Sequence, residues 1–168
     1  MNIIILTHAH FDHAENAAQI SKALGIPIGM SEKDCNLISS NENQMLSAET
    51  FLGKIVLSAS LKDFSVRTLQ EFKPDIFLKD GDSLSDYGVN ASIIALPGHT
   101  DGSIGIDVDN KGFIVGDALM NMFYPTVSML FHDKSEMLDS ARKISRLGDR
   151  IIYFGHGKPV SNKQWVKK

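Results

Sequence analysis

The segment that most restricts how this chain can fold is residues 7–13, which read Thr-His-Ala-His-Phe-Asp-His directly after a short apolar, β-branched run. The run predicts a strand, and in an extended chain His8 and His10 point to the same side because side chains alternate. Asp12 and His13 then lie where the chain turns toward a predicted helix. Imidazole and carboxylate groups suit Zn, Fe or Mn, so the segment predicts a metal site that can hold two ions.

Length and composition indicate one ordinary globular domain over residues 1–168. Hydrophobic residues make up 43% and charged residues 22% of the chain, which is typical of a domain with a sizeable core. A net charge of −3 and a pI near 6.0 argue against binding of nucleic acid through bulk charge. Cys35 is the single cysteine, so no internal disulfide can form, and no apolar stretch approaches the ~20 residues of a membrane span. We therefore expect a cytoplasmic protein that acts on a small molecule, with no nucleic-acid or membrane partner.

Periodicity and turn residues predict strands and helices along the rest of the chain. We expect strands at 27–30, 75–78, 91–96, 104–108, 112–115 and 150–154, and helices at 14–24, 31–38 and 133–147. The last helix opens on Asp133-Lys-Ser-Glu136, which resembles a capping box. Residues 41–47 are polar and predict a loop, whereas 51–70 carry helical and alternating patterns with equal weakness. Strands dominate, which favours sheets that are covered on one face by helices.

Three further short segments carry metal-ligand side chains, and each follows a predicted strand. His99 lies in Leu-Pro-Gly-His-Thr, Asp117 in Val-Gly-Asp, and His156 in Phe-Gly-His-Gly, where glycines let the backbone approach a crowded site. Folds commonly assemble sites where strands give way to loops. Five of the six histidines fall in these segments and in residues 7–13, and only His132 is left over. This grouping favours metal ligation over a set of isolated structural histidines.

In this pattern the chain resembles the metallo-β-lactamase superfamily of binuclear metallohydrolases. The order His-x-His-x-Asp-His, Gly-His-Thr, Gly-Asp and Gly-His is that family's signature, and the match in order and spacing extends from Asn2 to about Pro159. The resemblance implies a mixed α/β (α+β) fold, an αββα sandwich.

The resemblance also implies a ligand for every position of a two-metal site. One divalent ion, Zn with Fe or Mn as alternatives, would be bound by His8, His10 and His99, a second by Asp12, His13 and His156, and both by Asp117. A hydroxide would then lie between the ions, since two cations lower the pKa of a bound water and stabilise the attacking and leaving oxygens together. Asp12 would also orient this hydroxide and relay a proton to the leaving group.

Other side chains are candidates for supporting roles. The hydroxyls of Thr7 and Thr100 are candidates to hydrogen-bond ligand side chains, with ordinary turn capping as the alternative. The loop after Asp117 is expected to select the substrate, with three candidates at residues 121–133: Phe123, Tyr124 and His132. Tyr124 is the candidate catalytic donor to a developing oxyanion, as a tyrosine is in some lactonases. Packing within the loop is the alternative for all three.

Two positions narrow the branch of the superfamily. Asp117 stands where the commonest β-lactam-hydrolysing members have cysteine, and His10 stands where the di-iron flavoprotein oxygen reductases have glutamate. Glyoxalase II-like thioesterases, lactonases and phosphodiesterases remain, so we expect a hydrolase of an ester, thioester, lactone or phosphodiester. Two alternatives stay open. One is a mononuclear iron enzyme similar to persulfide dioxygenases, and the other is a metal-binding domain that is inactive without a partner chain.

Only six residues precede Thr7, whereas members of this superfamily normally begin with several strands before the first motif. By resemblance we expect the αββα sandwich to be N-terminally truncated, with part of its first sheet missing. An uncovered sheet exposes apolar side chains and unpaired backbone groups. We therefore expect a homodimer or a complementing chain to cover this surface.

Overall fold

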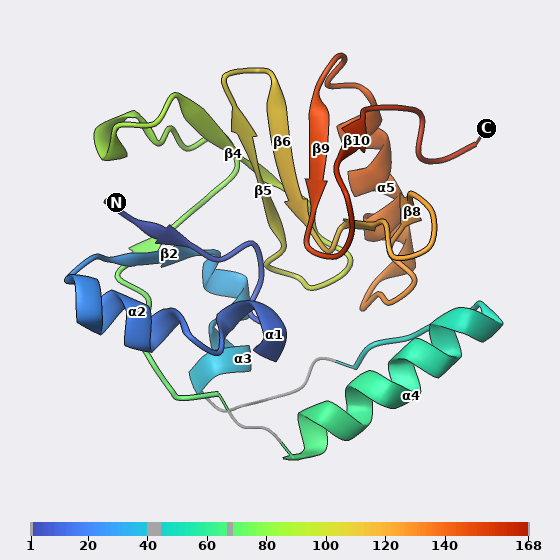
Figure 1. Ribbon diagram of the computed structural model, residues 1–168, viewed down its shortest axis with the longest axis horizontal. Coiled ribbons are helices and arrows are strands. Elements are labelled where there is room, and N and C mark those ends of the chain that lie inside the picture. Colours follow the sequence, from blue (N-terminus) through green and yellow to red (C-terminus); the bar gives the residue numbers. More distant parts are fainter. Residues whose placement is uncertain (1, 40–44, 67–68, 168) are drawn as a thin grey trace.

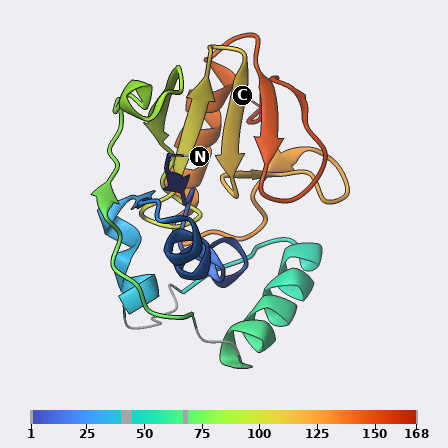
Figure 2. The ribbon, with the colours of Figure 1, turned by 60° about the vertical axis from the view of Figure 1, so that its left-hand side comes forward.

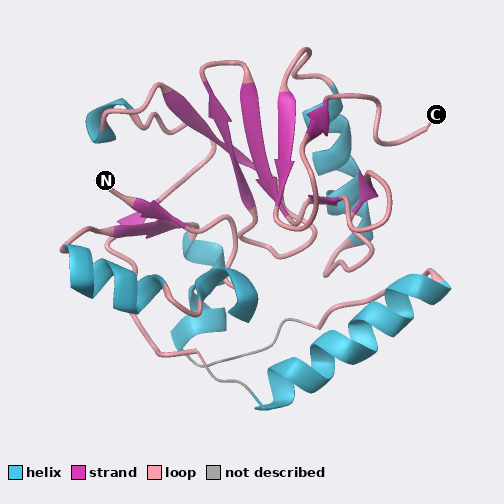
Figure 3. Cartoon of the chain, viewed as in Figure 1, coloured by secondary structure: helices cyan, strands magenta, loops and turns pink. Residues whose placement is uncertain are grey.

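Two β-sheets lie between outer helices in the structure, a computed structural model that describes residues 2–39, 45–66 and 69–167. Figures 1 and 2 show the N-terminal helices against the smaller sheet and the C-terminal helix against the larger one. This layering, with its mixed α/β content (Figure 3), is the αββα sandwich that the family resemblance implies. No helix in the described ranges is long and apolar enough to cross a bilayer.

The smaller sheet is parallel and has three short strands in the order β1-β2-β3, with bounds Ile4–Ile5, Ile28–Met30 and Ile76–Phe77. Helices from the N-terminal part of the chain pack on its outer side: α1 (Phe11–Ala14), α2 (Ala17–Leu24) and α3 (Cys35–Ser39), the last after the 3₁₀ turn Glu32–Asp34. The helix predicted at 31–38 is therefore present, with a 3₁₀ first turn.

The helix predicted at 14–24 is split in the structure. A single turn, α1, begins three residues earlier than predicted, and α2 begins only at Ala17. The early start places Asp12 and His13 inside a helical turn rather than ahead of it. Both side chains thereby approach Asp117 or His156 at the strand ends of the larger sheet.

The larger sheet has five strands in the order β10-β9-β6-β5-β4, in which β6 and β9 run parallel and the other neighbours antiparallel. The strand bounds are Ala91–Ala95 (β4), Ile104–Val108 (β5), Gly112–Gly116 (β6), Ile151–Phe154 (β9) and Val160–Ser161 (β10). A small hairpin of β7 (Leu119–Met120) and β8 (Thr126–Val127) follows β6. The four strands predicted between residues 91 and 154 are confirmed, whereas β7, β8 and β10 have no predicted counterpart.

One face of the larger sheet is covered by α5 (Lys134–Ser145). The Asp133 side chain accepts a hydrogen bond from the Glu136 backbone N–H at 2.9 Å, which confirms the predicted cap at the start of this helix. Ala141 and Ile144 of α5 are buried in one cluster with Phe113 and other side chains of the sheet. The helix ends two residues before the predicted Leu147.

The other face of the larger sheet turns toward the smaller sheet, which covers only part of it. Ile106 is buried there, and Ile114, directly opposite on β6, is 39% exposed. Tyr153 pairs with Ile114 and is 45% exposed, and Ile151 on the same strand is 40% exposed. We call Ile114, Ile151 and Tyr153 the exposed strip. It is the kind of apolar surface that the sequence leads us to expect.

The helix α4 (Phe51–Val66) occupies the segment whose pattern the sequence leaves undecided. Figures 1 and 2 show this helix apart from both sheets, below the loops at the ends of the large-sheet strands. Ahead of the helix, Ser47 and Phe131 exchange backbone hydrogen bonds of 2.8 and 3.1 Å, which ties the segment to the loop after β8. Of the loop predicted at 41–47, residues 41–44 lie outside the described residues.

Candidate metal centre

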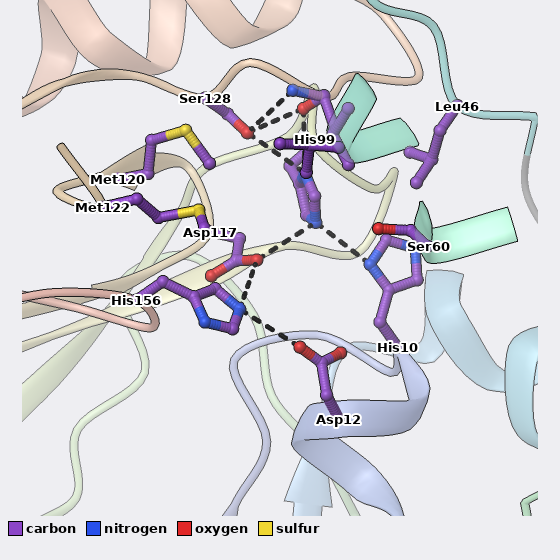
Figure 4. A pocket seen from close by; sticks show the side chains of 12 residues that line it. His10, Asp12, Leu46, Ser60, His99, Asp117, Met120, Met122, Ser128 and His156 are labelled. Carbon is purple, nitrogen blue, oxygen red and sulfur yellow. Dashed lines mark hydrogen bonds and ion pairs between the residues drawn. The ribbon is translucent and has the colours of Figure 1, made fainter. Parts of the chain in front are cut away.

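The seven side chains that the sequence singles out as metal ligands converge at one end of the sandwich. Figure 4 shows five of them: His10, Asp12, His99, Asp117 and His156. They come from the loop after β1, from α1, and from the ends of β4, β6 and β9. Three groups have candidate ligand atoms within 4.8 Å of one another: His8 with His10 and His99, Asp12 with His13 and His156, and His8 with His13 and Asp117. The first two groups have the same members as the two ligand sets implied by the family resemblance.

Asp117 lies between these two groups. Its Oδ1 is 3.5 Å from His13 Nε2, and its Oδ2 is 3.4 Å from His156 Nε2 and 3.7 Å from His99 Nε2. The carboxylate is buried, so bulk water does not screen these contacts. A single carboxylate is therefore positioned to interact with whatever each group binds.

Three buried atoms of the cluster make no hydrogen bond to any atom of the described residues: His8 Nε2, His13 Nε2 and Asp117 Oδ1. A buried polar atom without a partner costs free energy, so native structures rarely leave one. Here three such atoms belong to side chains that all point into one cluster. Cations at this position would satisfy all three atoms, so the residues present fit a metal site.

Hydrogen bonds outside the cluster set the orientation of two imidazoles. His99 Nδ1 lies 2.9 Å from the Leu130 carbonyl oxygen, so it donates there and leaves Nε2 as a lone pair facing His10 Nδ1 at 3.0 Å. Thr7 Oγ1 lies 3.2 Å from His8 Nδ1, which confirms the predicted contact between this hydroxyl and the imidazole. In both rings the nitrogen directed to the cluster is Nε2.

Thr100 does not contact a ligand side chain, contrary to the prediction. Its hydroxyl donates to Asp34 Oδ2 at 2.8 Å, and the same oxygen accepts the backbone N–H of Ala9 at 3.2 Å. Asp34 Oδ1 accepts the backbone N–H of Gly102 at 2.7 Å. This carboxylate, with 0% exposure, thus joins the loop that carries His8 and His10 to the loop that follows His99.

Sequence reasoning missed this role of Asp34. In the sequence, Asp34 is one of the acidic residues that commonly occupy the first turn of a helix, and its partners lie 25 to 68 residues away. The three hydrogen bonds lower the pKa of its carboxyl group, but burial has the larger effect, so this pKa is raised above its usual value. No local pattern distinguishes such a residue from an ordinary helix-start aspartate.

Burial and like charges keep part of the cluster neutral. Burial of the imidazole, and after it the neighbouring His10 and His99, hold the pKa of His8 well below its usual value. Burial and His99 lower the pKa of His10 to about 3. Neutral imidazole is the form that binds metal, so these two side chains are ready to do so at neutral pH.

The opposite side of the cluster carries charge. Hydrogen bonds to Asp117 and then to Asp12 raise the pKa of His156 to about 10. Burial alone would raise the pKa of the Asp117 carboxyl, but the nearby imidazoles of His13 and His156 outweigh it and hold this pKa well below its usual value. A cation bound here must displace protons, which makes its affinity depend on pH.

Two glycines permit the close approach of the ligand segments. A Cβ at Gly155 would lie 2.1 Å from Asp117 Oδ1 and 2.7 Å from His13 Cε1, so only glycine fits ahead of His156. Gly98, ahead of His99, has φ of +124°, and a Cβ there would lie 2.1 Å from the Met137 backbone nitrogen. The glycines that mark these motifs in the sequence are therefore required by the packing.

A pocket with a cavity of about 180 Å³ opens on the cluster. Besides five cluster residues, it is lined by Leu46, Val56, Ser60, Met120, Met122, Ser128 and Leu130. Sequence reasoning singled out none of these individually, although Met122, Ser128 and Leu130 lie in the predicted substrate loop at 121–133. Val56 and Ser60 come from a helix that has no clear apolar face.

The three substrate-loop candidates lie elsewhere. Tyr124 lines a neighbouring cavity formed with the start of α4, and Phe123 is exposed. His132 contacts the Met45 carbonyl oxygen at 3.2 Å and Asp101 Oδ1 at 3.7 Å. An oxyanion role for Tyr124 stays a prediction.

Known proteins resemble this chain in both sequence and fold. The profile of the Metallo-beta-lactamase superfamily matches residues 2–156. The chain belongs to this superfamily. It is 32% identical over 162 residues to the hydroxyacylglutathione hydrolase GloC of Haemophilus influenzae. This match covers 94% of this chain and 69% of GloC.

Two solved structures share the fold of this chain. The B3 metallo-beta-lactamase BLEG-1 is 25% identical with a TM-score of 0.71, and the match covers 95% of this chain and 71% of that one. TTHA1623, solved in a di-iron-bound form, is 21% identical with a TM-score of 0.69, over 98% of this chain and 77% of that one. This metallo-β-lactamase domain thus corresponds to roughly two thirds to three quarters of these relatives.

Proposed function

We propose that this chain is a metal-dependent hydrolase with a binuclear centre. His8, His10 and His99 would bind one divalent cation, Asp12, His13 and His156 a second, and Asp117 both. The observation that carries the proposal is the pair of ligand groups joined by one buried carboxylate, with three buried atoms that lack hydrogen-bond partners. Nitrogen and carboxylate oxygen donors in this mixture suit Zn, with Fe and Mn as alternatives.

Two such cations, when bound, supply a water-derived nucleophile at neutral pH and stabilise the attacking and leaving oxygens of an ester, thioester, lactone or phosphodiester. Asp117 and His99 are buried and fixed by their contacts, so they hold the centre in place. Asp12 is half exposed and its Oδ2 lies 3.1 Å from His156 Nε2. A carboxylate in this position is suited to accept a proton from the attacking water and to pass it to the leaving group.

The superfamily and the hydrolase relative support a hydrolytic reaction. The alternative of a mononuclear iron enzyme would leave the Asp12, His13 and His156 group without a function. Because the ligand atoms of this group also lie within 4.8 Å of one another, the geometry favours two ions.

The test combines metal analysis with turnover. The natively purified protein and the variants His10→Ala and His156→Ala are measured by plasma mass spectrometry, with His132→Ala as control because His132 lies outside the ligand groups. We expect two ions per chain in the wild type and control, fewer in both ligand variants, and chelator-sensitive hydrolysis of p-nitrophenyl acetate that added Zn²⁺ restores.

Three results would contradict the proposal. A wild type that binds no metal removes its basis. One iron per chain together with oxygen uptake on a persulfide indicates the dioxygenase alternative. Two ions without turnover on esters, thioesters, lactones and phosphodiesters indicate a metal-binding domain that is not active by itself.

A further inference from the structure

The pocket above the metal centre has two apolar walls on opposite sides. Figure 4 shows Met120 and Met122 on one side and Leu46 with Ser60 on the other, and the cluster forms the floor between them. Val56, from the same helix as Ser60, completes the second wall. The walls therefore come from α4 with the residues ahead of it and from the β7 segment.

Charge distinguishes the walls from the floor. None of the pocket-lining residues in the described part of the chain is a lysine or an arginine. The Ser128 hydroxyl is already engaged, because it donates to the Leu130 carbonyl oxygen at 2.7 Å. The positive charge of the pocket thus belongs to its floor, where His156 and the proposed metal ions lie. A carboxylate held between the walls, away from this floor, would lie against thioether and aliphatic groups with only the Ser60 hydroxyl nearby, which is unfavourable.

Size gives a second limit. The part of the substrate that lies between the two walls is limited to this cavity of about 180 Å³. The cavity accommodates a short aliphatic chain next to the reacting carbonyl. A glutathione group, with two carboxylates and a tripeptide's bulk, would extend beyond the two walls, and among the described residues that line them no lysine or arginine would pair with its carboxylates.

We infer that the substrates are uncharged esters, thioesters or lactones with a short aliphatic acyl chain, which binds between the methionine wall and the α4 wall. Anionic substrates such as glutathione thioesters are then poor, although GloC is named for that activity. This inference rests on the proposed hydrolase function, and it assigns Val56 and Met122 as specificity-determining residues.

Two nearly isosteric esters test the inference with the metal-loaded protein. p-Nitrophenyl pentanoate and p-nitrophenyl hemisuccinate share a leaving group and differ mainly in a terminal carboxylate. We expect kcat/KM for the pentanoate to exceed that for the hemisuccinate by about 10- to 100-fold, and S-lactoylglutathione to be at least as poor as the hemisuccinate.

Lysine substitutions locate the site. Val56→Lys puts an ammonium group on the pocket wall and should reduce the preference for the pentanoate at least tenfold, by improving the hemisuccinate. Ile55→Lys is the matched control, since Ile55 is the preceding residue on α4, is 51% exposed and does not line the pocket. Met122→Lys, at a position 48% exposed, repeats the test if Val56→Lys does not fold.

Binding without turnover gives an independent readout. In metal-free protein labelled at the methionine methyl groups, N-methylpentanamide should shift the signals of Met120 and Met122, whereas N-methylsuccinamate should not.

The outcomes separate the inference from the function on which it rests. A hemisuccinate or glutathione thioester hydrolysed as well as the pentanoate overturns the inference alone, and so does an equal effect of lysine at positions 55 and 56. No turnover of any substrate by protein that carries two metal ions overturns the proposed function, and the inference with it.

Discussion

Asp34 joins two ligand loops, and its removal is the most quantitative test of how the centre is held. The carboxylate accepts hydrogen bonds from Ala9 N, Gly102 N and Thr100 Oγ1 at 3.2, 2.7 and 2.8 Å, all in the protein interior. Asp34→Ala leaves the buried N–H groups of Ala9 and Gly102 without an acceptor, whereas the Thr100 hydroxyl keeps Ser103 Oγ as a partner at 2.8 Å. At about 1–3 kcal/mol for each N–H group, with part recovered by entry of water, the free energy of unfolding should fall by about 2–4 kcal/mol.

Asp34→Asn has the same shape and should cost less. The amide has one oxygen and one NH₂ group, so whichever way it is turned, one of the two backbone N–H groups faces a donor. We expect a loss of about 1–3 kcal/mol, the cost of one unsatisfied buried group. Both variants should also bind metal more weakly at the His8, His10 and His99 group, because Ala9 lies between two of its members.

Urea denaturation of the metal-free protein, followed by circular dichroism and by the fluorescence of the single tryptophan, measures these losses. Asp82→Asn is the control, since Asp82 accepts a backbone N–H from Lys79 at 2.7 Å at an exposed site and its loss should cost less than about 0.5 kcal/mol. If Asp34→Ala unfolds within about 0.5 kcal/mol of the wild type, Asp34 does not hold the loops together.

Backbone packing, pH and the sheet surface give three more predictions. Gly155→Ala should lower the metal content sharply because the added Cβ would clash with Asp117, whereas Gly25→Ala, with open space around the added Cβ, should not. Plasma mass spectrometry compares the metal content of the two variants, and an equal content contradicts the crowding argument. The metal-free protein should be most stable near pH 6.5. Below this pH the free energy of unfolding falls by up to ~1.4 kcal/mol per pH unit, because the pKa of the buried His8 is lowered and His8 takes up its proton only on unfolding. Above it the stabilisation from His156 is progressively lost as the pH rises toward its raised pKa of about 10. A monotonic pH profile in urea titrations refutes this. We also propose that a second copy of this chain covers the exposed strip, so light scattering of the purified protein should give a mass of at least twice 18.5 kDa, and a soluble monomer contradicts it.

The parts of the site that the sequence predicts are those with a local signal. His99, Asp117 and His156 each follow an apolar β-branched run and a glycine, and the structure brings all three to one cluster. Both the strand and the turn are encoded within a few residues, so neighbouring positions suffice to predict them.

The parts that the sequence does not predict depend on contacts between distant segments. Asp34 acts on residues up to 68 positions away. Val56 reaches the pocket from α4, whose apolar residues define no single face. Thr100 has a local partner in Ser103, at 2.8 Å, as well as Asp34, so its position beside a ligand histidine wrongly suggests a contact with that histidine.

The central claim is that two cations share this centre, and anomalous diffraction from crystals of the natively purified protein tests it most directly. We predict two peaks at the metal absorption edge, one within His8, His10 and His99 and one within Asp12, His13 and His156, with Asp117 in contact with both. No peak, or one peak with the second group of side chains unchanged, would contradict the account.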